Sequence, residues 1–127
     1  MSRNSVNITQ LSDSTNGAWS ALSMSSGSTY TSTGYLNDSS AGFNALELIS
    51  TAGTLAITYE LSNDNSNWRI PYDTDGNALN DIATAQGVTT GLIIVFGAQI
   101  GKYIRIKITP SGSDSTVTAK LITKENM

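Results

Sequence analysis

The clearest pattern of apolar and polar positions lies in two runs near the C-terminal end, residues 103–109 and 116–122. In the first run Ile104, Ile106 and Ile108 alternate with Tyr, Arg, Lys and Thr, a period of two that predicts a half-buried strand. The second run alternates in the same way, and its apolar positions are Val117, Ala119 and Leu121. Because a polar loop with Pro, Gly and Asp joins the runs, we expect them to pair as a β-hairpin.

The same period of two predicts further strands along the chain, at residues 4–10, 18–24, 28–35, 43–50 and 55–61. Residues 88–96 are continuously apolar in their second half, which is typical of a strand buried on both faces. Turn signals rich in Gly, Asn and Asp separate the strands about every 8–12 residues. The pattern therefore predicts an all-β fold, a two-sheet antiparallel sandwich of the jelly-roll or immunoglobulin-like kind with about eight strands.

The length of 127 residues suits one β-sandwich domain over residues 1–127. Residues 4–10 are expected to form either an edge strand or part of an N-terminal arm, residues 1–15, that reaches a neighbour. Residues 25–42 are the most polar and Gly/Ser-rich part of the chain, so we expect a long polar loop that contains one short strand. Loops of this kind often contact partners.

The low charge of the chain excludes several classes of partner. Charged residues make up 13% of the sequence and the net charge is -3, which argues against nucleic-acid binding because that needs clustered Lys and Arg. The outer face of the predicted hairpin carries a local exception, Lys102, Arg105, Lys107 and Lys120, which we interpret as a solvated strand face. The longest apolar run, 92–96, is too short to span a bilayer, so no membrane is expected.

The N-terminal residues lack the apolar core of a signal peptide, so we expect synthesis and folding in a cytoplasm. Cysteine and histidine are absent, which removes the thiol nucleophile, the commonest general base and the commonest metal ligands. We therefore expect no enzymatic activity and no cofactor. A hydrolase would need two opposed carboxylates at a defined separation.

Oxygen-rich side chains cluster between residues 64 and 81, and calcium is the metal that such ligands would suit. The candidate ligands are Asp64, Asp73, Asp75 and Asn77. The Gly of the Asp-Thr-Asp-Gly-Asn run comes too early for an EF-hand loop, and no Glu closes it. Ordinary Asx turns explain the cluster more simply.

Aromatic side chains and one arginine are the candidates for binding a partner, because aromatic rings combine apolar area with a polar handle. These candidates are Trp19, Tyr30, Tyr35, Trp68, Tyr72 and Arg105. The alternative is that these side chains pack at the ends and edges of the sandwich.

Two stretches resemble small β-sandwich proteins of tailed-bacteriophage virions. They are Ser62-Asn63-Asp64-Asn65-Ser66-Asn67-Trp68 and, after a loop that contains Asp75-Gly76, Gly101-Lys102-Tyr103-Ile104-Arg105-Ile106-Lys107-Ile108-Thr109. In capsid-decoration and tail-accessory modules the order strand, S-N-D-x-x-x-W, loop, K-Y-I-R-I recurs. The resemblance covers about residues 46–123 and implies a structural role without catalytic residues.

The resemblance leads us to expect a virion structural protein, most simply a capsid decoration or cement protein. Its partners would be the major capsid protein or other virion proteins, and it would be displayed on the particle exterior. We expect a homo-oligomer, with a trimer favoured because capsid lattices present threefold positions. The alternative is a tail-associated carbohydrate- or receptor-binding module, which would need a patch of exposed aromatic side chains.

Overall fold

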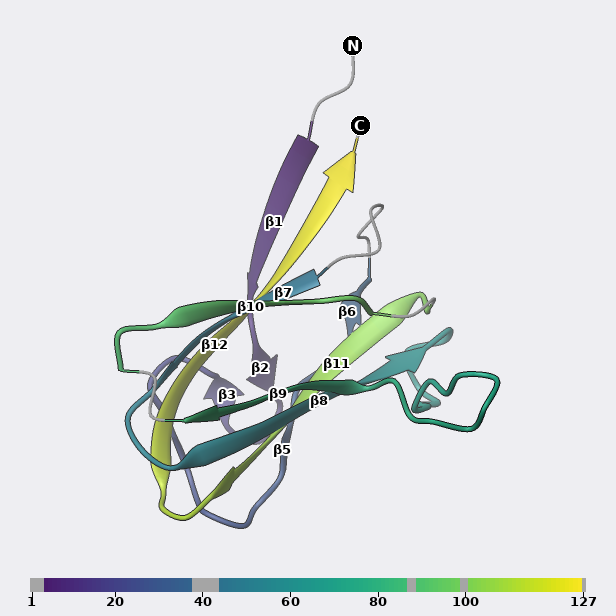
Figure 1. Cartoon of the computed structure of the whole chain (residues 1–127). Helices are drawn as coiled ribbons and strands as arrows, with labels where there is room; N and C mark the ends of the chain where they lie inside the picture. The colour runs from purple at the N-terminus through teal and green to yellow at the C-terminus, as the bar shows by residue number, and fades with distance from the viewer. Residues whose placement is uncertain (1–3, 38–43, 87–88, 99–100, 127) are drawn as a thin grey trace.

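The computed structural model describes residues 4–37, 44–86, 89–98 and 101–126, and these residues form an all-β fold (Figure 1). Its strands are β1 (Asn4–Gln10), β2 (Ser12–Asp13), β3 (Gly17–Ala18), β4 (Leu22–Met24), β5 (Tyr30–Thr31), β6 (Tyr35–Leu36), β7 (Asn44–Ser50), β8 (Thr54–Ser62), β9 (Asp81–Gln86), β10 (Leu92–Phe96), β11 (Tyr103–Ser111) and β12 (Ser115–Asn126). The predicted class is confirmed, although the described residues contain twelve strands rather than about eight. The difference comes from short strands of two or three residues and from β9, a six-residue strand that the sequence pattern did not predict. Within the described residues, no helix is long and apolar enough to cross a membrane.

The strand pairing is that of one long hairpin rolled up on itself. At its tip β8 pairs with β9, and moving outward β7 pairs with β10, β5 and β6 pair with β11, and β1 pairs with β12, all antiparallel. The roll produces two sheets, one in the order β1-β12-β7-β10 and one in the order β5-β11-β8-β9. Nested pairs distributed over two sheets give a jelly roll, so this is the sandwich type that the chain adopts.

The predicted hairpin of residues 103–122 is wrong in its pairing. β11 pairs with β5, β6 and β8 in one sheet, whereas β12 pairs with β1, β4 and β7 in the other. The turn at residues 112–114 therefore carries the chain from one sheet to the other. The apolar faces meet across the core rather than side by side, because alternation fixes the face of a strand but not its neighbour.

The core lies between the inner faces of the two sheets and consists of the alternating positions that the sequence pattern identified. β11 contributes Ile104, Ile106 and Ile108, each fully buried. The other fully buried large side chains are Trp19, Tyr59, Leu11, Met24, Leu46, Leu48, Leu55, Ile57 and Leu121. Burial of apolar surface on this scale is the main stabilising term of the fold.

Two segments with weak sequence signals belong to the sheets. β1 pairs with β12 over its whole length, from Asn4 opposite Asn126 to Gln10 opposite Lys120. The two strands run side by side past the end of β7, so both chain ends lie at the same end of the molecule (Figure 1). The predicted strand at 28–35 is present as two short pieces, β5 and β6, that both pair with β11. Residues 38–42 of the predicted polar loop lie outside the described residues, as do Phe43 and Val88.

The basic side chains that we assigned to one face lie on two different sheets. Arg105 and Lys107 are on the outer face of β11, where both approach Oε1 of Glu60. Lys120 is on the outer face of β12 and approaches Glu47. These basic side chains therefore do not share one strand face, since β11 and β12 are not neighbours in a sheet.

Candidate functional site: the outer face of the β1-β12-β7-β10 sheet

An apolar row crosses the outer face of the β1-β12-β7-β10 sheet from edge to edge. Ile8 lies opposite Ile122, Ile122 opposite Ala45, and Ala45 opposite Val95. Directly opposed residues of antiparallel strands point to the same face. The four side chains therefore form one continuous row, which we call the outer apolar row.

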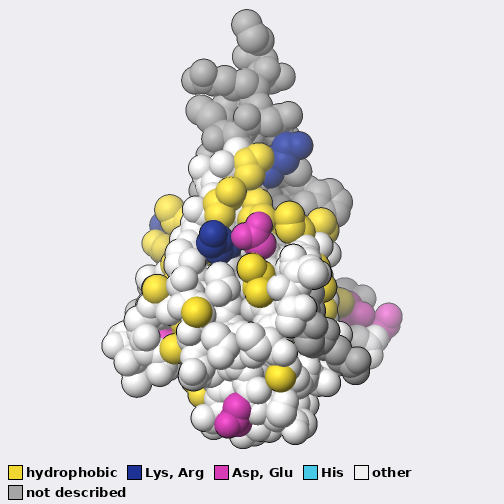
Figure 2. All heavy atoms as spheres, turned by 90° about the vertical axis from the view of Figure 1, so that its left-hand side faces the viewer, with side chains coloured by type: hydrophobic (Ala, Val, Ile, Leu, Met, Phe, Trp, Pro, Cys, Tyr) yellow, Lys and Arg dark blue, Asp and Glu magenta, His cyan; other side chains and the backbone are white. Residues whose placement is uncertain are grey.

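Most of this face is open to solvent. The exposed fractions are 64% for Ile8, 66% for Val95, 58% for Val6 and 59% for Ile93. Val6 and Ile93 share the face because each lies two residues along its strand from a member of the row. On the side of the molecule that Figure 2 shows, apolar side chains gather around an acidic and a basic group that lie next to each other.

The sequence of β1 places its apolar side chains on the outside. Val6 and Ile8 point outward, whereas Asn7 and Thr9 lie on the inner side and are half-buried. An edge strand that served only its own core would have the opposite arrangement. The alternation of Val6 and Ile8 was visible in the sequence, but a period of two does not tell which face is the core.

The sequence of β10 is apolar on both sides, and this was interpreted as burial on both faces. The structure corrects that interpretation. Phe96 is buried and Leu92 and Ile94 pack against the core, but Ile93 and Val95 are exposed on the outer face. β10 is the last strand of its sheet, and no element of the described chain covers its outer side.

A single ion pair lies in the middle of the face. Lys120 Nζ is 3.9 Å from Glu47 Oε1, on the row next to the outer apolar row, where the two residues are directly opposed on β12 and β7. Gln10 and Ile93 complete that row at its two ends. Both charged side chains are about two-fifths exposed, so each carries donors or acceptors that are free to meet a partner.

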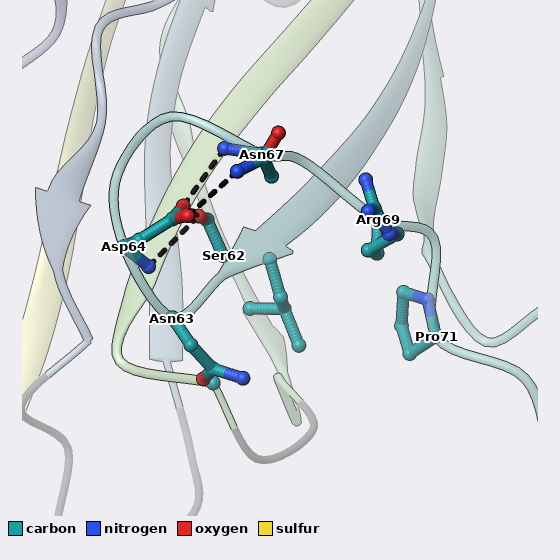
Figure 3. Close-up of a pocket in the computed structure, with 8 residues that line it drawn as sticks. Ser62, Asn63, Asp64, Asn67, Arg69 and Pro71 are labelled. Carbon is teal, nitrogen blue, oxygen red and sulfur yellow. Dashed lines mark hydrogen bonds between the residues drawn. The ribbon is translucent and has the colours of Figure 1, made fainter.

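A hollow lies at the tip of the rolled hairpin, between β8 and the loop that follows it (Figure 3). Its volume is about 400 Å³, and it is lined by Leu61, Ser62, Asn63, Asp64, Asn67, Arg69, Pro71 and Gly101. Asp64 accepts hydrogen bonds from the backbone N–H groups of Asn67 and Ser66 and from the Asn67 side chain. These bonds hold the pKa of Asp64 well below its usual range, and they use its oxygens to close the loop.

The other calcium candidates lie in a second Asx turn. Asp73 accepts hydrogen bonds from the backbone N–H groups of Asn77 and Asp75, at 2.9 Å each, and from the Asn77 side chain. The bond from the Asn77 backbone has the largest effect on the Asp73 pKa, which lies below its usual value. Within the described residues, no three acidic side chains converge as a metal site would require.

The partner-binding candidates do not form one patch. Trp19 has to be removed from that list, because its ring is fully buried in the core. Tyr30 and Tyr35 are half-buried, and their hydroxyl groups accept hydrogen bonds from the backbone N–H groups of Ser25 and Ser12. Tyr72 is the exposed member of the set.

Trp68 and Arg105 contact each other rather than a common ligand surface. The Arg105 guanidinium lies 4.6 Å from the centre of the Trp68 ring and also binds Glu60 through Nε and Nη2. Both side chains are half-buried. Sequence reasoning therefore found half-buried aromatic positions but missed the outer apolar row, for which the continuous apolar run of β10 was the available signal.

Comparison with known proteins finds chains of similar fold but identifies no family. No protein-family model and no curated protein matches the chain. A chain of infectious bursal disease virus, Gx strain, is 18% identical with a TM-score of 0.52, over 96% of this chain and 32% of the viral chain. A mutant VP2 protein of the same virus, from derived T=1 particles, is 18% identical with a TM-score of 0.53, over 96% of this chain and 32% of its own.

A peptidase also contains a region of similar fold. Tripeptidyl peptidase 2 is 11% identical with a TM-score of 0.63, over 93% of this chain and 10% of the enzyme. The chain thus spans about a third of the viral proteins and a tenth of the peptidase. At these identities the similarity shows a shared fold alone, and function has to be argued from the surface of this chain.

Proposed function

We propose that this chain is a virion structural protein, most simply a capsid decoration or cement protein that binds an outer capsid lattice. The observation that carries the proposal is the apolar outer face of the β1-β12-β7-β10 sheet. A protein that works by association needs such a surface, because exposed contiguous apolar area on a soluble domain marks interaction sites. The jelly roll is also an architecture of viral capsid domains, and the resemblance of residues 62–68 and 102–106 to phage virion modules points the same way.

In this role the protein acts through binding energy rather than chemistry. Contacts that span neighbouring capsid subunits add buried interface area to the shell. Binding only to the assembled lattice then stabilises the lattice by mass action. The proposal includes no catalytic activity and no cofactor, and it places the protein on the particle exterior after synthesis in a bacterial host. Its partners are the major capsid protein or other virion proteins, together with further copies of itself.

Co-sedimentation with expanded capsids of the phage that encodes the chain tests the proposal. The folded protein, at micromolar concentration, is expected to pellet with capsids and to remain in the supernatant without them. Circular dichroism of the unbound fraction shows that the fold is intact. If folded protein does not associate with expanded capsids or with any other part of the particle, the virion role is wrong.

The hollow at the tip of the rolled hairpin favours a second candidate, a tail-associated carbohydrate- or receptor-binding module. Asn63, Asn67 and Arg69 line the hollow and offer amide and guanidinium groups that can bind hydroxyl groups of a sugar. Pro71 also lines it, and the next residue, Tyr72, is exposed and can stack on a sugar ring. A glycan array probed with the full chain at millimolar ligand would show binding that Tyr72→Ala abolishes. A blank array would exclude this candidate.

A further inference from the structure

The outer apolar row crosses the four strands β1, β12, β7 and β10, so whatever covers it must be about as wide as these four strands together. Its two ends, Ile8 and Val95, lie on opposite edge strands, and both are about two-thirds exposed. A peptide added to one edge would leave the other edge uncovered. A second sheet laid face to face, at the usual spacing of about 10 Å, would cover the whole row.

We propose that the cover is a second copy of this chain, packed outer face to outer face about a twofold axis. The axis runs parallel to the strands and midway between the two central strands, β12 and β7. This operation lays β12 of one copy over β7 of the other, and β1 over β10. The same patch is then used on both subunits, as in an isologous interface.

The two charges at the centre of the face, Lys120 and Glu47, are complementary under this symmetry. Lys120 and Glu47 are directly opposed on the two central strands, so the axis passes between them. Lys120 of one copy then faces Glu47 of the second copy, and Glu47 of the first faces Lys120 of the second. The ion pair becomes a four-charge cluster of alternating sign in the middle of the interface, and within this cluster no charge lies directly opposite one of the same sign.

The sizes of the side chains are complementary as well. The same axis lays Ile122 over Ala45 of the second copy, so that a large side chain meets a small one at the centre of the outer apolar row. At the ends of the row Ile8 meets Val95, which joins the two most exposed members of the row. Alternation of large and small positions across facing layers allows the side chains to interdigitate.

The arrangement differs from the trimer that the threefold positions of a capsid lattice favour. A trimer joins two different patches of each subunit, whereas the outer face is complementary to itself. The proposal does not depend on the virion role, since self-association of the face follows from its own side chains. Capsid binding is argued from the same face, so the dimer is the form of the free protein and has to dissociate before the face binds a lattice.

Light scattering coupled to size-exclusion chromatography, with sedimentation velocity over a range of concentrations, tests the proposal on the full chain. The native protein is expected to be a dimer that dissociates on dilution. Ile8→Lys and Val95→Lys, made separately, are each expected to weaken the dimer about tenfold or more, because each places an unpaired charge against an apolar side chain. Leu36→Lys is the matched control, since Leu36 is similarly exposed on the other sheet and its change should leave the dimer intact.

Charge exchange in the centre of the face gives a second, independent measurement. Glu47→Lys alone and Lys120→Glu alone each place like charges together and should weaken the dimer. The double exchange, Glu47→Lys with Lys120→Glu, restores opposite charges and should restore dimerisation toward the native level. Thermal unfolding of each variant verifies that the subunit itself remains folded.

Three results would overturn the proposal. They are a monomer at all accessible concentrations, a trimer, and a dimer whose stability neither Ile8→Lys nor Val95→Lys changes. A dimer weakened by Val95→Lys but not by Ile8→Lys would overturn it too, because it would show edge pairing at β10. The virion role is tested separately. A monomer that still pellets with capsids contradicts only the twofold pairing, whereas a dimer that ignores the particle contradicts only the virion role.

Discussion

The indole N–H of Trp19 donates a 2.7 Å hydrogen bond to Oδ2 of Asp13, next to the short β2-β3 hairpin. Trp19 is fully buried, and its backbone bonds to Leu11 and Ala119 tie the hairpin to β12. The same carboxylate accepts the backbone N–H groups of Thr15 and Asn16 through its other oxygen. One side chain thus closes the turn and satisfies the polar atom of the largest core residue.

Asp13→Ala is expected to destabilise the fold by about 1–3 kcal/mol, because the indole N–H would be left without its acceptor in the core. Urea unfolding followed by tryptophan fluorescence measures the change. The matched background is Trp19→Phe, which lacks the donor. The cost of Asp13→Ala should be smaller there, and an equal cost in both backgrounds would show that the hydrogen bond is not its source.

Acid should destabilise the protein through three carboxylates. Burial raises the pKa of Asp13, but hydrogen bonds from Trp19, Asn16 and Thr15 outweigh it, so the pKa lies below the usual 3.8. Asp64 and Asp73 also have lowered pKa values, because backbone and side-chain N–H groups bind their charged forms. A lowered folded-state pKa stabilises the fold above the unfolded-state value, and this stabilisation is lost as the pH falls through the folded-state value.

The melting temperature should therefore be insensitive to these groups above about pH 5 and should fall progressively below about pH 4. Differential scanning calorimetry between neutral and strongly acidic pH measures the profile. A variant with Asp64→Asn and Asp73→Asn should have a shallower acid limb, because two of the three titrating groups are gone. An acid limb of unchanged slope would assign the acid sensitivity to other residues.

Gly34 lies where no side chain fits. A Cβ at this position would lie 2.7 Å from two ring atoms of Trp68 and would overlap the Asn65 side-chain oxygen. Gly34→Ala is therefore expected to cost about 1–3 kcal/mol through overpacking, measured as a lower melting temperature. Asn65→Gly should rescue part of this loss, since it removes the oxygen and Gly suits the positive φ of 60° at that position. Equal melting temperatures for Gly34→Ala and the native chain would mean that the 62–68 loop moves aside.

The sequence pattern predicted which side chains form the core much better than it predicted which strands are neighbours. Ile104, Ile106 and Ile108 alternate with polar residues, and they are buried in any sandwich that contains the strand. Whether the following strand pairs with β11 or crosses to the opposite sheet depends on the turn at residues 112–114 and on pairings with distant strands. No local pattern records those pairings, so the predicted hairpin failed while the core assignment of Val117, Ala119 and Leu121 held.

The candidate site was harder to predict because a period of two gives two faces and does not name the inner one. Val6 and Ile8 have the pattern of core residues, and only the pairing of β1 with β12 shows that they point outward. The run Leu92–Phe96 did contain a usable signal. A strand that is apolar on both faces needs a cover on each side. In β10 the core of this chain covers only the inner side, and Ile93 and Val95 on the outer side remain exposed.

Arg105 connects the two sequence stretches that resemble phage virion proteins. It lies in the K-Y-I-R-I stretch and stacks on Trp68 of the other stretch. If this contact is structural, Arg105→Lys should destabilise the fold by about 1 kcal/mol, since Lys keeps the charge but loses the planar stack and the second N–H to Glu60. A double-mutant cycle with Trp68→Leu should give a coupling energy of about 0.5–2 kcal/mol.

Lys107 provides the matched control, because its Nζ lies 3.6 Å from the same Glu60 oxygen without stacking on the ring. Lys107→Ala should change stability by less than about 1 kcal/mol, as for other exposed ion pairs, and should show no coupling to Trp68→Leu. If Arg105 and Trp68 are also uncoupled, the ring and the guanidinium are free to serve a ligand. In that case the surface around Trp68 and Arg105 would be a better candidate for ligand binding than the outer face of the β1-β12-β7-β10 sheet.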